Sequence, residues 1–172
     1  SEIFNEIYDF LNSKIKNKRI SALVTAGPTK EYIDPVRYIT NRSSGKQGYE
    51  LAKSLHKKGF ETTLITGPTN LKIDEDINLI KVETAEEMFR ATQRNLPTDI
   101  AIFSAAVADF KINKKSQYKI KNRSLLVNLE RNVDILNYVS NHNSLRPKLV
   151  IGFAAETNDL EKNAKKKLSN KN

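Results

Sequence analysis

Residues 20–48 read ISALVTAGPTKEYIDPVRYITNRSSGKQG, and this stretch decides the fold class. Ile20–Thr25 is a short run of mainly apolar and β-branched residues, which predicts a buried strand. A long polar segment with glycines follows, and apolar residues at helical spacing return over residues 48–58. A strand, a long loop and a helix in this order are typical of an open α/β sheet, which binds ligands at the carboxyl ends of its strands.

The loop between this strand and this helix is rich in groups that bind anions. Glycine, serine and asparagine expose backbone N–H groups, and Arg37, Arg42 and Lys46 carry positive charge. The end of the loop also forms the N-terminus of the helix, where free N–H groups and the helix dipole favour negative charge. We therefore predict a phosphate site made by Gly27, Ser43, Ser44, Gly45 and Lys46. A capped helix start without a ligand is the alternative.

Strands and helices alternate along the rest of the chain. We expect strands at 62–66, 77–82, 100–104 and 149–153, and helices at 2–16, 85–94, 133–138 and 159–168. This alternation predicts an α/β fold with a doubly wound, Rossmann-like parallel sheet and right-handed crossovers.

One segment breaks the alternation. Residues 118–121 and 125–129 flank Asn122-Arg123-Ser124 and predict a protruding β-hairpin arm. Such an arm either pairs with another subunit or is a simple surface hairpin.

Composition limits the class of protein. The 172 residues are enough for one domain with a sizeable core. The net charge of +9, much of it in residues 111–121 and 162–171, fits nucleic acid, a polyanionic small ligand or a solvated basic face. The chain has no cysteine, which excludes disulfides and thiol chemistry. We find no membrane-length apolar run and no signal-peptide pattern, so we expect a cytoplasmic protein without a membrane partner.

The sequence does not match two common nucleotide-binding motifs. Gly45-Lys46 resembles part of a phosphate loop, but Gln47 stands where serine or threonine would bind Mg²⁺. No G-x-G-x-x-G fingerprint occurs either, which argues against a dinucleotide dehydrogenase.

Small residues with one carboxylate follow the strand expected at 100–104. Asp109 in Ser104-Ala105-Ala106-Val107-Ala108-Asp109 would hold a ribose hydroxyl or a metal ion, or would cap a helix. Phe153 would pack against a base, or belong to the core.

Taken together, six motifs in one register resemble the phosphopantothenate–cysteine ligase family, the synthetase domain of the bifunctional coenzyme A biosynthesis flavoprotein. The resemblance runs from about residue 20 to the end of the chain and is carried by residues 24–29, 34–41, 43–48, 105–110, 119–121 and 152–157.

This resemblance implies a reaction. 4'-Phosphopantothenate, CTP and L-cysteine would give phosphopantothenoylcysteine, CMP and diphosphate. A carboxylate is a poor electrophile, so its oxygen would first attack the α-phosphate of CTP, and the cysteine amine would then displace CMP from the acyl-cytidylate.

The resemblance also assigns roles to residues. Asn41 would orient the acyl-cytidylate carbonyl, Arg37 would support the same loop or the substrate phosphate, and Lys119 would neutralise the triphosphate or leaving diphosphate. Asp109 would bind CTP directly or through Mg²⁺. The remaining CTP-binding residues would be Ser104, Ala105, Val133, Asp134, Ile135, Leu136, Phe153, Lys167 and Lys171.

The sequence departs from the family pattern in two respects, and the second bears on the domain organisation. Val133 stands where the family usually has proline, and the family continues past residue 172 with a further strand. We therefore expect residues 19–172 to be a ligase domain that is incomplete at its C-terminus. Residues 1–18 resemble the linker from a flavin-dependent decarboxylase domain, whose FMN site we do not expect here.

Two other functions stay open at this point. One is a Rossmann-type oxidoreductase that binds NADP through its basic loops, and the other is a basic nucleic-acid-binding module. The second lacks an aromatic-rich basic face, so we expect no nucleic acid partner. The ligase family instead implies a homodimer formed through the hairpin at 118–129.

Overall fold

The computed structural model describes residues 19–73 and 76–153, together with positions 159, 162, 165, 168 and 169. The helix expected over 2–16 lies outside these residues, as do Lys167 and Lys171. Residues 162, 165 and 168 have helical geometry, in agreement with the helix expected over 159–168.

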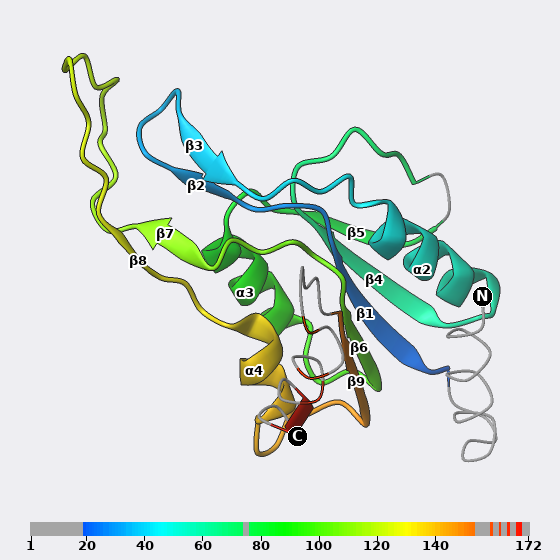
Figure 1. The fold of residues 1–172 in the computed structure, drawn as a ribbon. Coiled ribbons are helices and arrows are strands. Elements are labelled where there is room, and N and C mark those ends of the chain that lie inside the picture. The colour runs from blue at the N-terminus through cyan, green and yellow to red at the C-terminus, as the bar shows by residue number, and fades with distance from the viewer. Residues whose placement is uncertain are drawn as a thin grey trace.

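A five-stranded parallel sheet forms the centre of the fold (Figure 1). Its spatial order is β5-β4-β1-β6-β9, which confirms the expected doubly wound α/β architecture. The strands are β1 (Ser21–Ala26), β4 (Glu61–Thr66), β5 (Asn78–Lys81), β6 (Ile100–Phe103) and β9 (Leu149–Gly152).

The central strand β1 is buried on both faces, as its continuous apolar run predicts. Ala22 and Val24 point into one core together with Leu55, whereas Leu23 points into the other core together with Met88. Successive side chains of a strand alternate between faces, so this one strand anchors a hydrophobic core on each side of the sheet.

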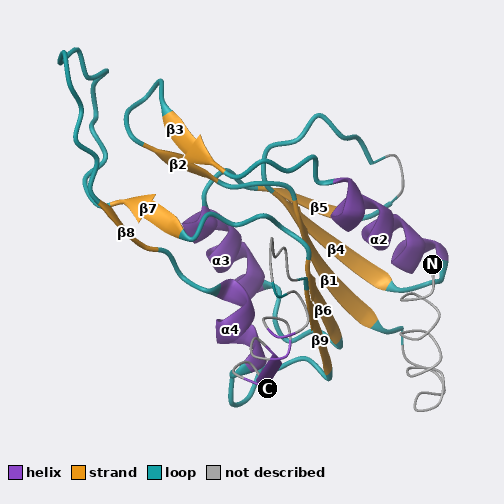
Figure 2. Cartoon of the chain, viewed as in Figure 1, coloured by secondary structure: helices purple, strands orange, loops and turns teal. Residues whose placement is uncertain are grey.

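Helices cover both faces of the sheet (Figure 2). Helix α2 (Lys46–Lys57) packs on one face against β1 and β4. Helix α3 (Ala85–Arg94) and helix α4 (Ile135–Ser140) belong to the other core. Helix α3 begins with the capping box formed by Thr84 and Glu87.

A short hairpin of β2 (Lys30–Tyr32) and β3 (Tyr38–Thr40) lies inside the segment that the sequence predicted to be a loop. The strands have three residues each, too few for an alternating pattern to stand out. The hairpin carries the chain away from the end of β1 and back to α2, so it determines where the following residues, including Asn41, lie.

The predicted strand bounds of the arm are wrong. The paired strands are β7 (Phe110–Ile112) and β8 (Leu129–Arg131), not residues 118–121 and 125–129. The arm itself protrudes as expected, beside the β2–β3 hairpin (Figure 1). Residues 113–128 extend beyond the short two-stranded base as irregular backbone, which we call the arm loop.

In the described part of the chain, no helix has the length and apolar character needed to cross a membrane.

Candidate active site

The sheet reverses its strand order between β1 and β6, and the candidate site lies at the carboxyl ends of these two strands. From β1 the chain passes through α2 to β4 on one side, whereas β6 lies on the other side. Beyond the strands, the Ala106 N–H donates to the Gly27 carbonyl at 2.9 Å, and the Ala108 N–H donates to Thr29 Oγ1 at 2.9 Å. Crevices at such switch points are where open α/β sheets bind ligands.

A cavity of about 560 Å³ occupies this switch point, which is within the usual size range of small-molecule sites. Five segments meet around it: the end of β1, the end of β6 with the loop that follows, the start of the loop between β3 and α2, the stretch that joins β8 to α4, and the end of β9. Of the residues predicted from the sequence, its lining contains Asn41, Ala105, Asp109, Val133, Asp134, Ile135, Leu136 and Phe153.

Asn41 crosses from the β3 side of this cavity to the β6 side. Its side-chain amide donates to the Val107 carbonyl at 2.9 Å and to the Ala106 carbonyl at 3.4 Å. The second contact is at the long end of the hydrogen-bond range. The contact with the Val107 carbonyl is therefore the stronger of the two.

The loops after β6 and β8 are joined at the cavity wall. The Asn132 N–H donates to the Asp109 carbonyl at 2.8 Å. Asp134 caps α4, because its carboxylate accepts the Asn137 N–H at 2.9 Å. Asp134 therefore has a local structural task in addition to lining the cavity.

The described residues contain no group of three or more acidic or histidine side chains that could hold a metal ion. A Mg²⁺ ion that arrives with a nucleotide does not need such a group, since Mg²⁺ is commonly bound by one or two carboxylates plus phosphate oxygens and water. Asp109, in the cavity lining, fits that requirement as one carboxylate.

The predicted phosphate loop lies beside this cavity rather than in its lining. Gly27 and Gly45 both have positive φ, at 72° and 76°, a region that L side chains rarely adopt. Ser43 Oγ accepts the Gly45 N–H at 3.3 Å, and Ser44 Oγ accepts the Lys46 N–H at 3.4 Å. Both contacts are long, so two of the N–H groups that we expected to face an anion have only weak partners in the serines that precede α2.

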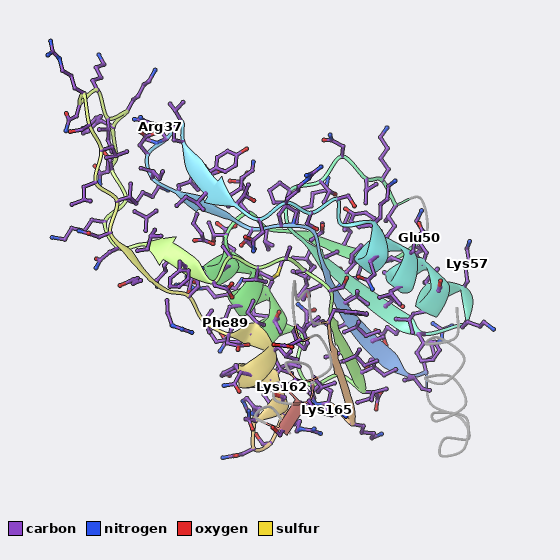
Figure 3. The ribbon with its side chains drawn as sticks, in the orientation of Figure 1. Arg37, Glu50, Lys57, Phe89, Lys162 and Lys165 are labelled. Carbon is purple, nitrogen blue, oxygen red and sulfur yellow. The ribbon has the colours of Figure 1, made fainter. Side chains whose placement is uncertain are left out.

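Three other predicted residues also lie outside the cavity lining. Ser104 is in the backbone ladder, where its N–H donates to the Thr25 carbonyl at 3.2 Å. Lys119 is in the arm loop. Arg37 pairs with Asp34, and Figure 3 places it at the β2–β3 turn, away from α2 with its labelled Glu50 and Lys57.

Sequence reasoning did not assign Arg42 or Arg131 to the nucleotide site, yet both line the cavity. The signal was present, because Arg42 directly follows Asn41 and Arg131 precedes the predicted residues 133–136 by two positions. Guanidinium pairs well with phosphate, so these two arginines are candidates for binding an anionic ligand in a lining that also contains Asp109 and Asp134.

Comparisons with known proteins agree on the family. Residues 16–172 match the family model of the DNA/pantothenate metabolism flavoprotein C-terminal domain. The chain belongs to this family.

Curated members of the family are similar over almost the whole chain. The bifunctional coenzyme A biosynthesis protein CoaBC of Haemophilus influenzae is 41% identical over 174 residues, and that of Borreliella burgdorferi is 43% identical over 178 residues. Each alignment covers 99% of this chain but only 43% and 45% of the relative. The chain therefore spans less than half the length of these relatives.

A solved structure supports the same relationship. The crystal structure of the C-terminal domain of a CoaBC protein superposes with a TM-score of 0.76 at 40% sequence identity, over 88% of this chain and 72% of that domain. The family membership favours the ligase interpretation over the oxidoreductase and nucleic-acid alternatives.

Proposed function

We propose that this chain forms the substrate-activating site of a CTP-dependent phosphopantothenate–cysteine ligase that acts in coenzyme A biosynthesis. The observation that carries the proposal is the position of Asn41. The β2–β3 hairpin delivers this amide to a cavity of about 560 Å³ at the switch point of the sheet, opposite the loop after β6. Similarity to the CoaBC proteins supplies the substrate class.

The proposed reaction has two steps. In the first, a carboxylate oxygen of 4'-phosphopantothenate attacks the α-phosphorus of CTP, and diphosphate leaves. In the second, the amine of L-cysteine attacks the acyl carbon and loses a proton, and CMP leaves with one of the original carboxylate oxygens. Negative charge develops on the carbonyl oxygen in the second step, where a fixed hydrogen-bond donor is most useful.

In this scheme Asn41 donates its weakly held amide hydrogen to that carbonyl. The acyl oxygen would take the place of the Ala106 carbonyl, which accepts at 3.4 Å, while the 2.9 Å bond to the Val107 carbonyl keeps the side chain oriented. A donor positioned before the reaction costs no reorganisation when the charge appears.

The cations near the cavity suit the phosphates of CTP. Arg42 and Arg131 line it directly, and Lys119 would act from the arm loop. Mg²⁺ would be held by Asp109 together with the nucleotide phosphates, where it would neutralise their charge. The loop at 43–46 would face the phosphate of 4'-phosphopantothenate.

A second copy of the chain is the proposed partner of the arm. Tyr118 is 80% exposed and Leu126 is 88% exposed. Ile112, Ile120, Leu125 and Leu126 share the lining of a cavity of about 390 Å³ under the arm loop. Exposed apolar surface of this kind commonly marks a protein interface, so the arm would bury it in a homodimer.

The relatives are bifunctional proteins. We propose that this domain is likewise fused to, or works beside, a flavin-dependent decarboxylase domain, and that FMN belongs to that other domain.

Diphosphate release tests the proposed function. The intact gene product should release diphosphate from CTP when 4'-phosphopantothenate is present, and from ATP at least ten times more slowly. Omission of cysteine should stop amide formation. If 4'-phosphopantothenate does not stimulate diphosphate release from any nucleoside triphosphate, the proposal is wrong.

A further inference from the structure

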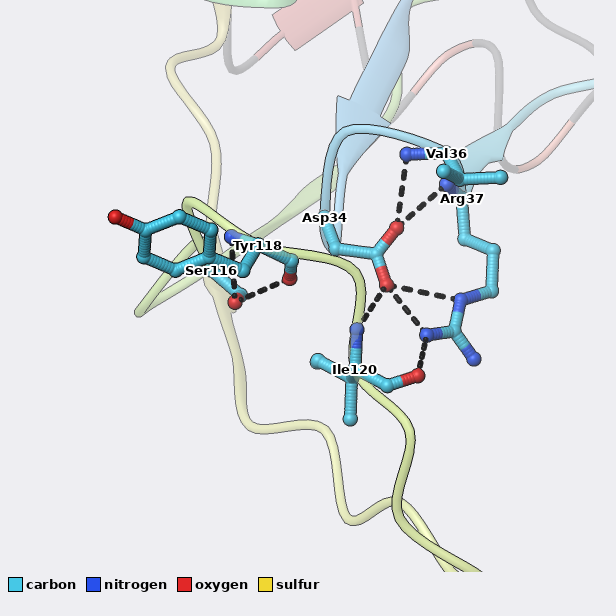
Figure 4. A network of polar contacts seen from close by, with 6 residues as sticks. All are labelled: Asp34, Val36, Arg37, Ser116, Tyr118 and Ile120. Carbon is cyan, nitrogen blue, oxygen red and sulfur yellow. Dashed lines mark hydrogen bonds and ion pairs between the residues drawn. The ribbon is translucent and has the colours of Figure 1, made fainter.

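Asp34 is a buried carboxylate that sequence reasoning gave no role. It lies in the turn between β2 and β3 and is fully buried. Its Oδ1 accepts the Val36 and Arg37 N–H groups, each at 2.9 Å. Its Oδ2 accepts the Arg37 Nε at 3.0 Å as well as Arg37 Nη2 (Figure 4). A buried charge requires partners of this number and kind, because an unpaired one is costly.

A further donor to Asp34 comes from the arm loop, far away in sequence. The Ile120 N–H donates to Asp34 Oδ2 at 3.1 Å, and Arg37 Nη2 donates to the Ile120 carbonyl at 2.7 Å (Figure 4). Both backbone polar groups of Ile120 are therefore held by one ion pair, whose carboxylate is buried and whose arginine is partly exposed. We call this arrangement the Asp34–Arg37 clamp.

The arm loop is held a second time on the other side of Lys119. The Ser116 N–H donates to the Ile33 carbonyl at 3.0 Å. The Ser116 side chain donates to the Tyr118 carbonyl at 2.7 Å and accepts the Tyr118 N–H at 3.2 Å (Figure 4). Lys119 thus lies between two fixed neighbours, although it belongs to an irregular and largely exposed segment.

We propose that Asp34 is a positioning residue, which acts through Arg37 and Ile120 to fix the backbone at Lys119. This inference rests on the proposed function, in which Lys119 faces the nucleotide phosphates. It also gives Arg37 a different task from phosphate binding, because its guanidinium is engaged by Asp34 and by the Ile120 carbonyl.

The electrostatics agree with this geometry. The Arg37 guanidinium holds the pKa of Asp34 well below its usual range. Asp34 therefore stays charged at every pH at which a ligase assay is run, and the clamp persists across that range.

The Asp34→Asn substitution breaks the clamp with a minimal change of shape. It replaces one carboxylate oxygen by an amide that donates, in a site where every partner is also a donor. The matched control is Glu130→Gln in β8, which removes the exposed Lys111–Glu130 ion pair at the base of the same arm without touching Ile120. Arg37→Lys is a second variant that removes the forked guanidinium but keeps the charge.

Hydrogen exchange tests the clamp independently of activity. In Asp34→Asn and Arg37→Lys, we expect the Ile120 amide to exchange at least tenfold faster, with unchanged exchange in β1 and β6. Glu130→Gln should match the wild type. Unchanged exchange at Ile120 in both clamp variants would overturn the proposal, whatever the activity.

A double-mutant cycle with Lys119→Met tests the positioning role. Asp34→Asn should lower kcat/KM for CTP at least tenfold when Lys119 is present and less than threefold when it is methionine. Equal losses in both backgrounds would mean that Asp34 does not act through Lys119, and would also overturn the proposal. If the wild type releases no diphosphate, the proposed function is wrong. The contacts of the Asp34–Arg37 clamp are then tested by hydrogen exchange at Ile120 alone.

Discussion

At the scale of single residues, Asn41 carries the proposed chemistry. We predict that Asn41→Asp still releases diphosphate but forms the amide on the order of 100-fold more slowly, because a catalytic donor is replaced by an acceptor. Diphosphate and phosphopantothenoylcysteine should be measured in the same reaction. Equal loss of both products would contradict the role given to Asn41.

The buried side chain of Glu31 makes the stability of the protein depend on pH. Its side chain is only 6% exposed and accepts the Ala85 N–H at 3.1 Å. Burial raises the pKa of Glu31 above its usual value of about 4.5. Because the folded protein binds this proton more tightly than the unfolded chain, the stability contribution of Glu31 is present at low pH and falls as pH rises through the folded-state pKa.

Glu31→Gln removes this titration but keeps an oxygen that can accept the Ala85 N–H. We therefore expect the variant to match the wild type near pH 4 and to become progressively more stable than it as pH rises. Urea unfolding from pH 4 to pH 8 measures the difference. Glu50→Gln on the exposed face of α2 is the control, and a gap that shrinks with rising pH would contradict the prediction.

At the scale of elements, Gly48 sets how closely α2 packs on β1. A Cβ on Gly48 would lie 2.5 Å from the Ala26 Cβ. Alanine is the better helix former, yet overpacking typically costs about 1–3 kcal/mol. Gly48→Ala should therefore lower the free energy of unfolding in chemical denaturation, while Lys53→Ala on the same helix should change it little. A stabilised Gly48→Ala protein would contradict this packing.

The arm carries the prediction about assembly. Leu126→Asp places a charge at the position of the most exposed large apolar side chain in the described part of the chain. We expect it to weaken the homodimer at least tenfold in sedimentation measurements, while Glu130→Gln leaves the dimer intact. A wild-type protein that stays monomeric at micromolar concentration would remove the basis of this prediction.

The elements also show where sequence reasoning succeeds. The buried run at 20–25 and the capping box at 84–87 are local signals, and both structures formed where expected. The strand bounds of the arm were predicted wrongly because tertiary contacts override the local pattern. Ile120 has strand-like neighbours in sequence, but its backbone is taken by Asp34 and Arg37 from another hairpin.

At the scale of the whole molecule, the topology brings the site together. Asn41, Asp109 and residues 133–136 are far apart in sequence but meet where β1 and β6 end. The sequence predicted these residues through motif resemblance and through the rule that ligands bind at carboxyl ends of strands. It did not assign Arg42 and Arg131 to the cavity, although both stand near predicted residues. Basic residues are common on exposed surfaces, and the path of each loop decides which side of the fold they reach.

Isotope transfer tests the central claim, activation of the substrate carboxylate by CTP, most directly. The intact gene product is given CTP, L-cysteine and 4'-phosphopantothenate that carries ¹⁸O in both carboxylate oxygens, and CMP is analysed by mass spectrometry. Our account predicts one ¹⁸O atom in each CMP formed with phosphopantothenoylcysteine. Unlabelled CMP, or label in the diphosphate instead, would contradict it.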